Sequence, residues 1–306
     1  MSELLHILFD VVVPVVVMIG LGVLVDWRLR LDVRTLAQLN FAVFVPALVA
    51  VKILESELSV AQLGAVAGVA VVHISVLAMI AAVVARGKDR AVLICAAMFC
   101  NSGNIGLPVA ELAWPGTGAS IMAVILMVQN FASFSFGVAL LQRGEAGSPS
   151  GFGPRLLGLA KVPVIWAILL ALLWRATGWD MPKQVGVPLG YLGDGLIPVA
   201  LLTLGVQLRH SLAGRFQWPR LGLGLALRLL VGPLVAYTIL SLWPQAPDVS
   251  AVILIAGGLP VAVNVYILAA QYDNEADLAA QLVFTSTVAS VVVLPVVIAI
   301  ARAQWG

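Results

Sequence analysis

Residues 95–114 read CAAMFCNSGNIGLPVAELAW and lie inside an apolar run long enough to cross a membrane. Polar and helix-breaking residues interrupt this run at Asn101, Ser102, Asn104 and Pro108. A helix does not pass smoothly through such a cluster, because proline removes a backbone donor and clashes with the preceding turn. Unpaired backbone groups cost several kcal/mol each in lipid, so a broken helix persists only where protein or water covers it. We therefore interpret the cluster as a site embedded in a membrane.

The composition of the whole chain supports this interpretation. Of 306 residues, 61% are hydrophobic and 10% are charged, whereas soluble domains carry about 25% charged residues. We expect an all-α integral membrane protein whose surroundings are the lipid bilayer. The basic residues form no stripe of the kind that nucleic acids need, so a nucleic-acid partner is not expected. The first apolar run lacks the features of a cleaved signal and is expected to be retained.

Ten apolar segments have about the 20 residues that a hydrocarbon core of about 30 Å requires. The predicted spans are 5–25, 35–53, 62–85, 91–114, 118–141, 161–177, 188–208, 218–243, 249–271 and 278–301. The longest connection, 142–160, is rich in glycine, serine and proline. It divides the chain into a first unit, 1–141, and a second unit, 161–306, with five predicted spans each.

The basic residues predict the orientation of these spans. Twelve lie in odd-numbered connections, namely Arg28, Arg30, Arg34, Arg86, Lys88, Arg90, Arg143, Arg155, Lys161, Arg209, Arg215 and Arg220. Only four, Lys52, Arg175, Lys183 and Arg302, lie on the opposite face. Since cytoplasmic loops carry the excess of Lys and Arg, the odd connections, including the linker 142–160, are predicted to be cytoplasmic. Both termini are then on the extracytoplasmic side.

A short internal repeat indicates how the two units are related. GLPVA occurs at 106–110 and again at 258–262, 152 positions later. Pro46 and Pro198 are separated by the same offset. A unit with an odd number of spans must enter the bilayer in the opposite sense from the preceding one, so the pattern predicts an inverted repeat. Inverted repeats are typical of secondary transporters, whose sites lie near the midplane between discontinuous helices.

Several longer motifs carry a family resemblance across nearly the whole chain. They are LNFAVFVPAL (39–48), NSGNIGLPVAELAW (101–114), IPVALLTLGVQL (197–208), GGLPVAVNVYILAAQYDNEADLA (257–279) and TSTVASVVVLPVV (285–297). In these stretches the sequence resembles the auxin efflux carrier family, which includes plant carriers and bacterial permeases for malonate or malate. The resemblance implies ten helices in two inverted five-helix units, with helices 4 and 9 crossing where they unwind. The short central connection is more similar to a bacterial permease, which implies the bacterial inner membrane, and the resemblance also implies a homodimer.

The predicted breaks define an anion site. Pro108 and Pro260 each suit the first turn of a second half-helix, where the missing N–H costs nothing. Both half-helices would then direct free N–H groups to the bilayer centre, each with about half a positive charge. Such helix starts bind anions without a lysine. We therefore expect a small organic carboxylate as the substrate.

Amide and hydroxyl side chains near the breaks are the candidate substrate-binding groups. Asn101, Ser102 and Asn104 are expected either to face the substrate or to satisfy the unwound backbone. Asn264, one turn beyond Pro260, is expected either to bind substrate or to form a hydrogen bond between helices.

Two further amides, Gln129 and Asn130, lie in the middle of span 118–141. Consecutive residues on a helix diverge by about 100°, so only one is expected to point directly at the site. The family resemblance favours Gln129, and a packing role between helices is the alternative for either.

Ionisable residues within spans are functional hypotheses by default. Glu111, one turn past Pro108, is a candidate for coupling to an ion or for an exposed rim. Arg228 is expected to reach the cytoplasmic surface, to pair with a carboxylate or to meet the substrate. No metal or cofactor is expected, and sodium and protons both remain open as coupling ions.

These observations predict a secondary transporter for small organic anions, including mono- and dicarboxylates and auxin-like weak acids. It would work by alternating access as one repeat unit rocks against the other. A sodium/proton antiporter or a sodium-coupled organic-anion symporter of related fold is the alternative. A sodium/proton antiporter would need adjacent carboxylates within the membrane as ion ligands, and no Asp–Asp pair occurs in the predicted spans. An enzyme is not expected, because the sequence contains no HExxH or GxSxG motif.

Overall fold

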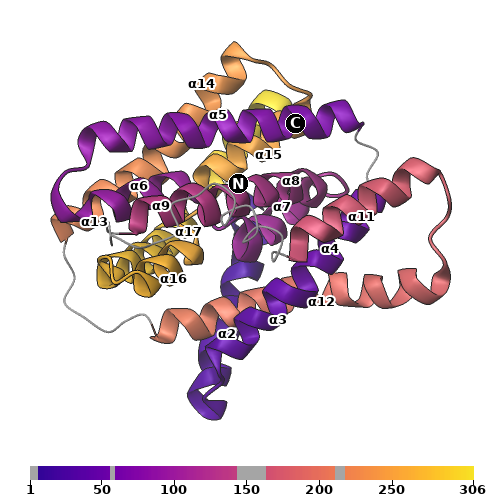
Figure 1. The fold of residues 1–306 in the computed structure, drawn as a ribbon, viewed down its shortest axis with the longest axis horizontal. Coiled ribbons are helices and arrows are strands. Elements are labelled where there is room, and N and C mark those ends of the chain that lie inside the picture. Colours follow the sequence, from indigo (N-terminus) through magenta and orange to yellow (C-terminus); the bar gives the residue numbers. More distant parts are fainter. Residues whose placement is uncertain (1–5, 56–58, 143–162, 211–217) are drawn as a thin grey trace.

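The computed structural model describes residues 6–55, 59–142, 163–210 and 218–306, and their regular elements are helices (Figure 1). Seven helical stretches in this part are long and apolar enough to span a membrane. They are Leu8–Leu29, Thr35–Glu55, Ala61–Val84, Gly118–Leu141, Lys183–Gln207, Trp218–Leu242 and Ala276–Trp305. The protein is therefore an integral membrane protein built from helices.

The three remaining predicted spans have a different form. Span 161–177 is the short apolar helix α11 (Pro163–Thr177), with residues 161 and 162 outside the described part. Span 91–114 is divided into α6 (Arg90–Met98), the π-helix η4 (Ser102–Gly106) and α7 (Leu107–Ala113). Span 249–271 is divided into α15 (Pro247–Gly258) and α16 (Val263–Gln271). The chain is thus broken in the two spans where the sequence predicts breaks.

One group of helices, which we call the flanking bundle, packs along the site. It contains α2 (Val13–Leu29), α3 (Val33–Leu39), the π-helix η2 (Asn40–Phe44), α4 (Val45–Glu55), α11 and α12 (Lys183–His210). In Figure 1, α2, α3 and α12 form the lower part of the molecule. The buried carboxylate of Asp26 on α2 pairs with Arg209 on α12, which ties these two helices together.

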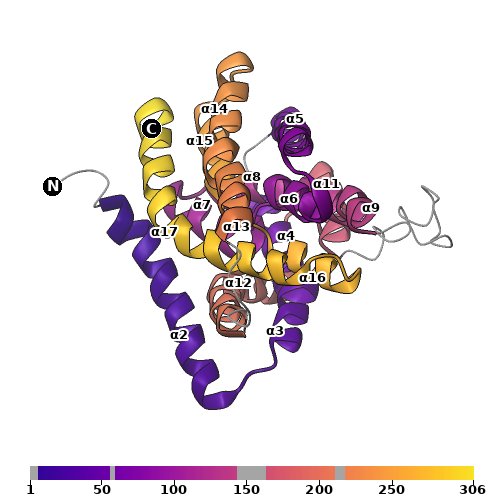
Figure 2. The ribbon, with the colours of Figure 1, turned by 90° about the vertical axis from the view of Figure 1, so that its left-hand side faces the viewer.

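Most of the remaining helices form a second group, which we call the crossing bundle because it contains both broken helices (Figure 2). Besides α6, η4, α7, α15 and α16 it contains α5 (Val60–Val84), α8 (Gly118–Ala132), η5 (Ser133–Gly137), α9 (Val138–Leu141), α13 (Trp218–Leu225), η6 (Ala226–Val231), α14 (Gly232–Leu242) and α17 (Ala276–Trp305). Both predicted units, 1–141 and 161–306, contribute to each bundle. The bundles therefore do not coincide with the two halves of the chain, and most of the predicted linker 142–160 lies outside the described residues.

Close packing of α2 on α12 depends on small residues at the contact. A Cβ at Gly205 of α12 would overlap the carbonyl oxygen of Ile19 and would lie 2.9 Å from the Cα of Gly22. Glycine at this position lets the two backbones approach, as is typical of helix contacts in membranes.

Replacing Gly205 by alanine is expected to lower the thermal unfolding midpoint of the purified protein in detergent by several degrees. The cause is overpacking, which typically costs about 1–3 kcal/mol. Gly190→Ala on the same helix is the matched control, because an added Cβ there meets nothing within 4 Å. Equal midpoints for the two variants would contradict this account of the contact.

Candidate functional site

The two breaks lie against each other and exchange backbone hydrogen bonds. Cys100 and Val261 form an isolated antiparallel bridge. The N–H of Asn101 donates to the carbonyl of Pro260 at 2.8 Å, and the N–H of Ala262 donates to the carbonyl of Phe99 at 2.9 Å. Backbone groups freed by one break are thereby satisfied by the other, which is the condition for non-helical backbone inside a membrane.

The structure corrects the predicted position of one of the two prolines. The second half-helix of the first broken span begins at Ser102, six residues before Pro108, as a π-turn followed by α7. Asn101 caps it, with its Oδ1 accepting from the N–H of Asn104 at 3.2 Å. Pro260 lies in the unwound segment before α16, where its carbonyl is needed for the bridge. Pro108 therefore lies in the first turn of α7, as predicted, although the helical stretch already begins with η4, whereas Pro260 lies before the first turn of its half-helix.

This correction also weakens the repeat that the sequence displays. The first GLPVA copy, 106–110, lies within the second half-helix, whereas the second copy, 258–262, covers the break itself. The two copies therefore do not occupy equivalent positions, and their common offset is not evidence of structural equivalence.

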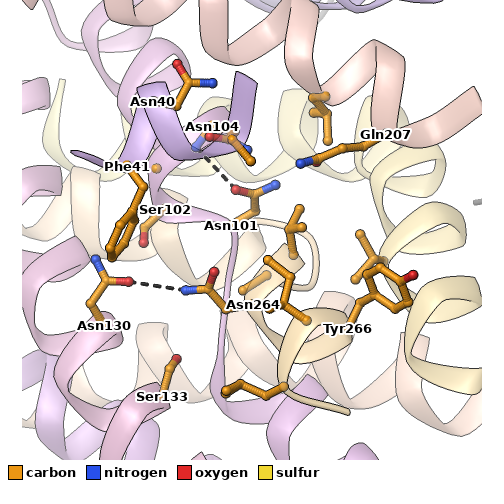
Figure 3. A pocket seen from close by; sticks show the side chains of 18 of the residues that line it. Asn40, Phe41, Asn101, Ser102, Asn104, Asn130, Ser133, Gln207, Asn264 and Tyr266 are labelled. Atoms are coloured by element: carbon orange, nitrogen blue, oxygen red, sulfur yellow. Dashed lines mark hydrogen bonds between the residues drawn. The ribbon is translucent and has the colours of Figure 1, made fainter. Parts of the chain in front are cut away.

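A cavity of about 1030 Å³ lies beside the crossing, between the two bundles (Figure 3). Six predicted substrate-binding residues line it: Asn101, Ser102, Asn104, Gln129, Asn130 and Asn264. Pro108, Pro260, Glu111 and Arg228 are not among its lining residues. The lining extends to Asp32 and Asp277, beside the first and ninth connections, and includes no Lys or Arg among the described residues.

Three buried polar atoms at the crossing have no hydrogen-bond partner within the described part of the chain. They are Nδ2 of Asn101, Oγ of Ser102 and Oε1 of Gln129, on side chains that are at most 5% exposed. A buried polar group without a partner costs about 1–3 kcal/mol. Such groups in a cavity wall are consistent with a ligand or water that completes their bonds.

Gln129 and Asn130 both line the cavity, against the expectation that only one would reach it. They face different neighbours. Nε2 of Gln129 donates to the Sγ of Cys100 at 3.4 Å, and Oδ1 of Asn130 accepts from Nδ2 of Asn264 at 3.2 Å. Figure 3 shows Asn130 and Asn264 pointing toward each other. The pair connects α8 to the first turn of α16.

The flanking bundle contributes lining residues that sequence analysis did not identify. Asn40 and Phe41 come from η2, and Gln207 comes from α12 and points toward Asn101 in Figure 3. Nδ2 of Asn40 donates to Oγ1 of Thr203 at 3.0 Å, which orients its side chain. Asn40 and Gln207 both lie in motifs that carry the family resemblance, so a polar residue in an otherwise apolar motif was the available signal.

The starts of both second half-helices face the cavity. Gly103 near the start of η4 lines the wall together with Val263 and Asn264 at the start of α16. Among the described residues, no side chain caps the first turn of α16. Two first-turn N–H groups of η4 are already bonded, that of Ser102 to the carbonyl of Cys100 and that of Asn104 to Asn101. The uncapped first turn of α16 therefore offers more donors, and both helix starts direct positive potential to the cavity.

Arg228 has a role that none of the sequence hypotheses described. It is fully buried on η6, rather than reaching the surface. Its guanidinium donates to the carbonyls of Ala97 at 2.8 Å, Ala256 at 3.2 Å and Gly257 at 2.5 Å. These carbonyls lie at the ends of α6 and α15, where a cation is favourable. Arg228 therefore holds the carboxyl ends of both first half-helices.

Glu111 lies outside the cavity and forms an ion pair between the bundles. Its Oε1 is 3.1 Å from Nζ of Lys52 on α4, with side chains 27% and 20% exposed, respectively. Its Oε2 accepts from the N–H of Ala119 at 3.3 Å. The hydroxyl of Ser120 on α8 donates to the carbonyl of Lys52 on α4 at 3.0 Å, which adds a second contact between the two bundles.

Two interrupted helices that cross beside a polar cavity place this protein in the class of membrane transporters. Comparisons with known proteins agree. A model of the membrane transport protein family matches residues 154–298. The chain is 30% identical over 216 residues to an "Uncharacterized transporter" of Methanothermobacter thermautotrophicus, covering 68% of this chain and 67% of that protein.

The chain belongs to the membrane transport protein family, which is the auxin efflux carrier family that its motifs resemble. It is a member of a transporter family and not an enzyme. It is also 27% identical over 207 residues to a "Putative malonate transporter" of Rhizobium meliloti. That match covers 64% of this chain and 62% of the relative, so the chain spans less than two thirds of that protein.

Replacing Arg228 by methionine is expected to lower the thermal unfolding midpoint strongly. The substitution removes a donor from three buried carbonyls. The carbonyl of Ala256 keeps the N–H of Leu259 at 3.3 Å, and each carbonyl that is left unsatisfied costs about 1–3 kcal/mol. Arg228→Lys keeps the charge and is expected to lose less. Arg28→Met, at an exposed position, is the control for loss of an arginine. A midpoint for Arg228→Met equal to that of the control would contradict the capping role.

Proposed function

We propose that this protein is a secondary transporter that moves small organic carboxylates across the membrane by alternating access. The observation that carries the proposal is the cavity beside the crossing, whose wall combines buried amide and hydroxyl atoms that lack a partner in the described chain with two helix starts. Asn101, Asn104, Asn130 and Asn264 are the proposed substrate contacts. Ser102 and Gln129 complete the polar wall.

The charge distribution supports an anionic substrate of small size. Each helix start supplies about half a positive charge, and backbone N–H groups at such ends bind carboxylates. The described lining contains no basic side chain to compete for this role. Asp32 and Asp277 lie toward one end of the cavity, so they would repel an anion from that end and favour its position near the crossing.

We also propose the arrangement in the membrane that the sequence predicts. The chain would cross the inner membrane of a bacterium ten times, with both termini outside and the linker 142–160 in the cytoplasm. Units 1–141 and 161–306 would form an inverted repeat, and two copies of the chain would form a homodimer. The antiparallel crossing of the two broken spans supports the inverted relationship.

The proposed motion separates the flanking bundle from the crossing bundle, rather than one half of the chain from the other. The cavity lies between the bundles and extends to the first and ninth connections, which are predicted to be cytoplasmic. At the opposite end, which is predicted to be extracytoplasmic, the ion pair of Lys52 and Glu111 joins α4 of the flanking bundle to α7 of the crossing bundle. This arrangement supports a state that is closed outside by the ion pair and accessible from the cytoplasm.

Uptake into proteoliposomes tests the transport activity directly. Labelled malonate, malate and a monocarboxylate would be offered with and without sodium, a proton gradient or a membrane voltage. Saturable uptake of a carboxylate is the expected result. Strict dependence on sodium would favour the sodium-coupled symporter, and sodium/proton exchange without carboxylate uptake would favour the antiporter and overturn the proposal.

Asn104→Ala and Asn264→Ala are each expected to abolish uptake while leaving the unfolding midpoint within a few degrees of the parent protein. Both side chains line the cavity, and neither is fully buried, so their loss removes binding groups without opening the core. Thr238→Ala is the control, because its hydroxyl bonds only its own helix at the carbonyl of Leu234. Normal uptake by both cavity variants would remove the proposed site.

Glu111→Gln is expected to increase access to the cavity from outside, since it weakens the pair with Lys52 while keeping an acceptor for Ala119. The natural thiol of Cys100 lines the cavity and is free, so it reports that access in a Cys95→Ala background. The measurement is the rate at which a membrane-impermeant maleimide labels Cys100 on intact cells. A several-fold increase is expected.

The matched control breaks an ion pair within one bundle. Lys88→Gln removes the pair with Glu275, whose oxygen is 2.8 Å from Nζ of Lys88, and both residues belong to connections of the crossing bundle. It should leave the labelling rate of Cys100 unchanged. An equal effect of both substitutions would show that the Lys52–Glu111 pair does not control outer access.

A further inference from the structure

A second cavity, of about 1170 Å³, lies along the crossing bundle between α5, α6, α8 and α9. Most of its wall is apolar. Large side chains in that wall are exposed, including Val71 at 53%, Phe136 at 61% and Phe131 at 43%. All of these belong to helices that span the membrane, so the groove opens toward lipid and not toward the cavity at the crossing.

The polar lining of this groove is concentrated at one end. Lys88 and Arg90 follow α5, Gln142 follows α9, and Asn274 precedes α17. These positions lie at the third, fifth and ninth connections, all on the face that the basic residues predict to be cytoplasmic. The groove thus has a basic head and an apolar body, which matches the amphipathic form of a phospholipid.

Among the described residues, the ion pairs at the basic head involve Lys88 and Arg220 but not Arg90. Lys88 pairs with Glu275 at 2.8 Å, and Arg220 also pairs with Glu275 at 3.5 Å and with Asp89 at 3.0 Å. Arg90 is exposed, and its Nη2 makes a long bond of 3.4 Å to the carbonyl of Ala82. Arg90 therefore lies outside these ion pairs, and the side chains of Lys88 and Arg90 border the groove.

A buried acceptor lies at the same end. Asn274 is 3% exposed, and its Nδ2 donates to the carbonyl of Leu141 at 2.9 Å. Its Oδ1 has no hydrogen-bond partner within the described residues. An acceptor beside two cations suits a headgroup that carries both a phosphate and hydroxyl donors.

We propose that this groove binds one anionic phospholipid with a hydroxyl-bearing headgroup. The phosphate would lie at Lys88 and Arg90, a headgroup hydroxyl would donate to Asn274, and an acyl chain would follow the wall between α5 and α8. Basic pockets between spanning helices on the cytoplasmic side recognise anionic headgroups in this way. The proposal does not depend on the transported substrate, because the lining of this groove and that of the cavity at the crossing share no residue in the described part of the chain.

Native mass spectrometry of the purified protein in detergent tests the proposal, with dioleoyl phosphatidylglycerol and dioleoyl phosphatidylcholine offered in equal amounts. A basic side chain near the membrane surface favours an anionic lipid about fivefold. We expect one phosphatidylglycerol bound with at least about fivefold preference over phosphatidylcholine. The double variant Lys88→Gln/Arg90→Gln should lose this preference, and Glu275→Gln should increase it.

Two further variants make the result specific to the groove. Ala78→Trp places a bulky side chain in the apolar wall and should reduce binding of both lipids. Arg28→Gln/Arg30→Gln removes the same charge from another predicted cytoplasmic connection and should keep the preference. Equal binding of the two lipids by the unmodified protein would overturn the proposal, as would a preference that the Lys88 and Arg90 substitutions leave unchanged. Correct folding of each variant is checked by its unfolding midpoint.

Discussion

The structure depends on a mutual exchange of hydrogen bonds between two stretches of unwound backbone. Asn101 donates to Pro260, and Ala262 donates to Phe99, at 2.8 and 2.9 Å. Either break alone would leave polar groups bare in a medium that cannot solvate them. Together they satisfy one another, and Arg228 stabilises the carboxyl ends next to them. The start of α16 has no side-chain cap within the described residues, so its first-turn N–H groups remain available to a ligand.

The sequence was sufficient to predict that these spans break, because a continuous helix in lipid does not accommodate a cluster of amides, glycines and prolines. It was not sufficient to locate the breaks to the residue. Proline at 108 indicated a helix start and lies in the first turn of α7, yet the π-turn η4, capped by Asn101, begins the half-helix six residues earlier. The repeated GLPVA motif was misleading too, because the same five residues adopt different backbone conformations in the two spans.

Some residues of the site could likewise be predicted from the local sequence, whereas others reach the cavity only because distant parts of the chain pack together. Asn101, Asn104 and Asn264 were predictable because they lie at or near the breaks. Asn40 and Gln207 were not, since only the packing of the flanking bundle brings them to the cavity. Arg228 was visible as an unusual residue in a span, but its carbonyl partners are 28 to 131 positions away in the chain. No local pattern encodes such a contact.

The carbonyl coordination of Arg228 has an electrical consequence. A guanidinium stays protonated in proteins. The described hydrogen bonds of Arg228 go to carbonyls and not to a carboxylate. Its positive charge is therefore balanced only in part, by the dipoles of α6 and α15. One elementary charge moved through a potential of 100 mV changes in energy by about 2.3 kcal/mol. Any displacement of the crossing bundle along the membrane normal takes this charge with it. In the proposed cycle, the membrane potential would therefore bias which conformation the empty protein adopts, before any solute binds.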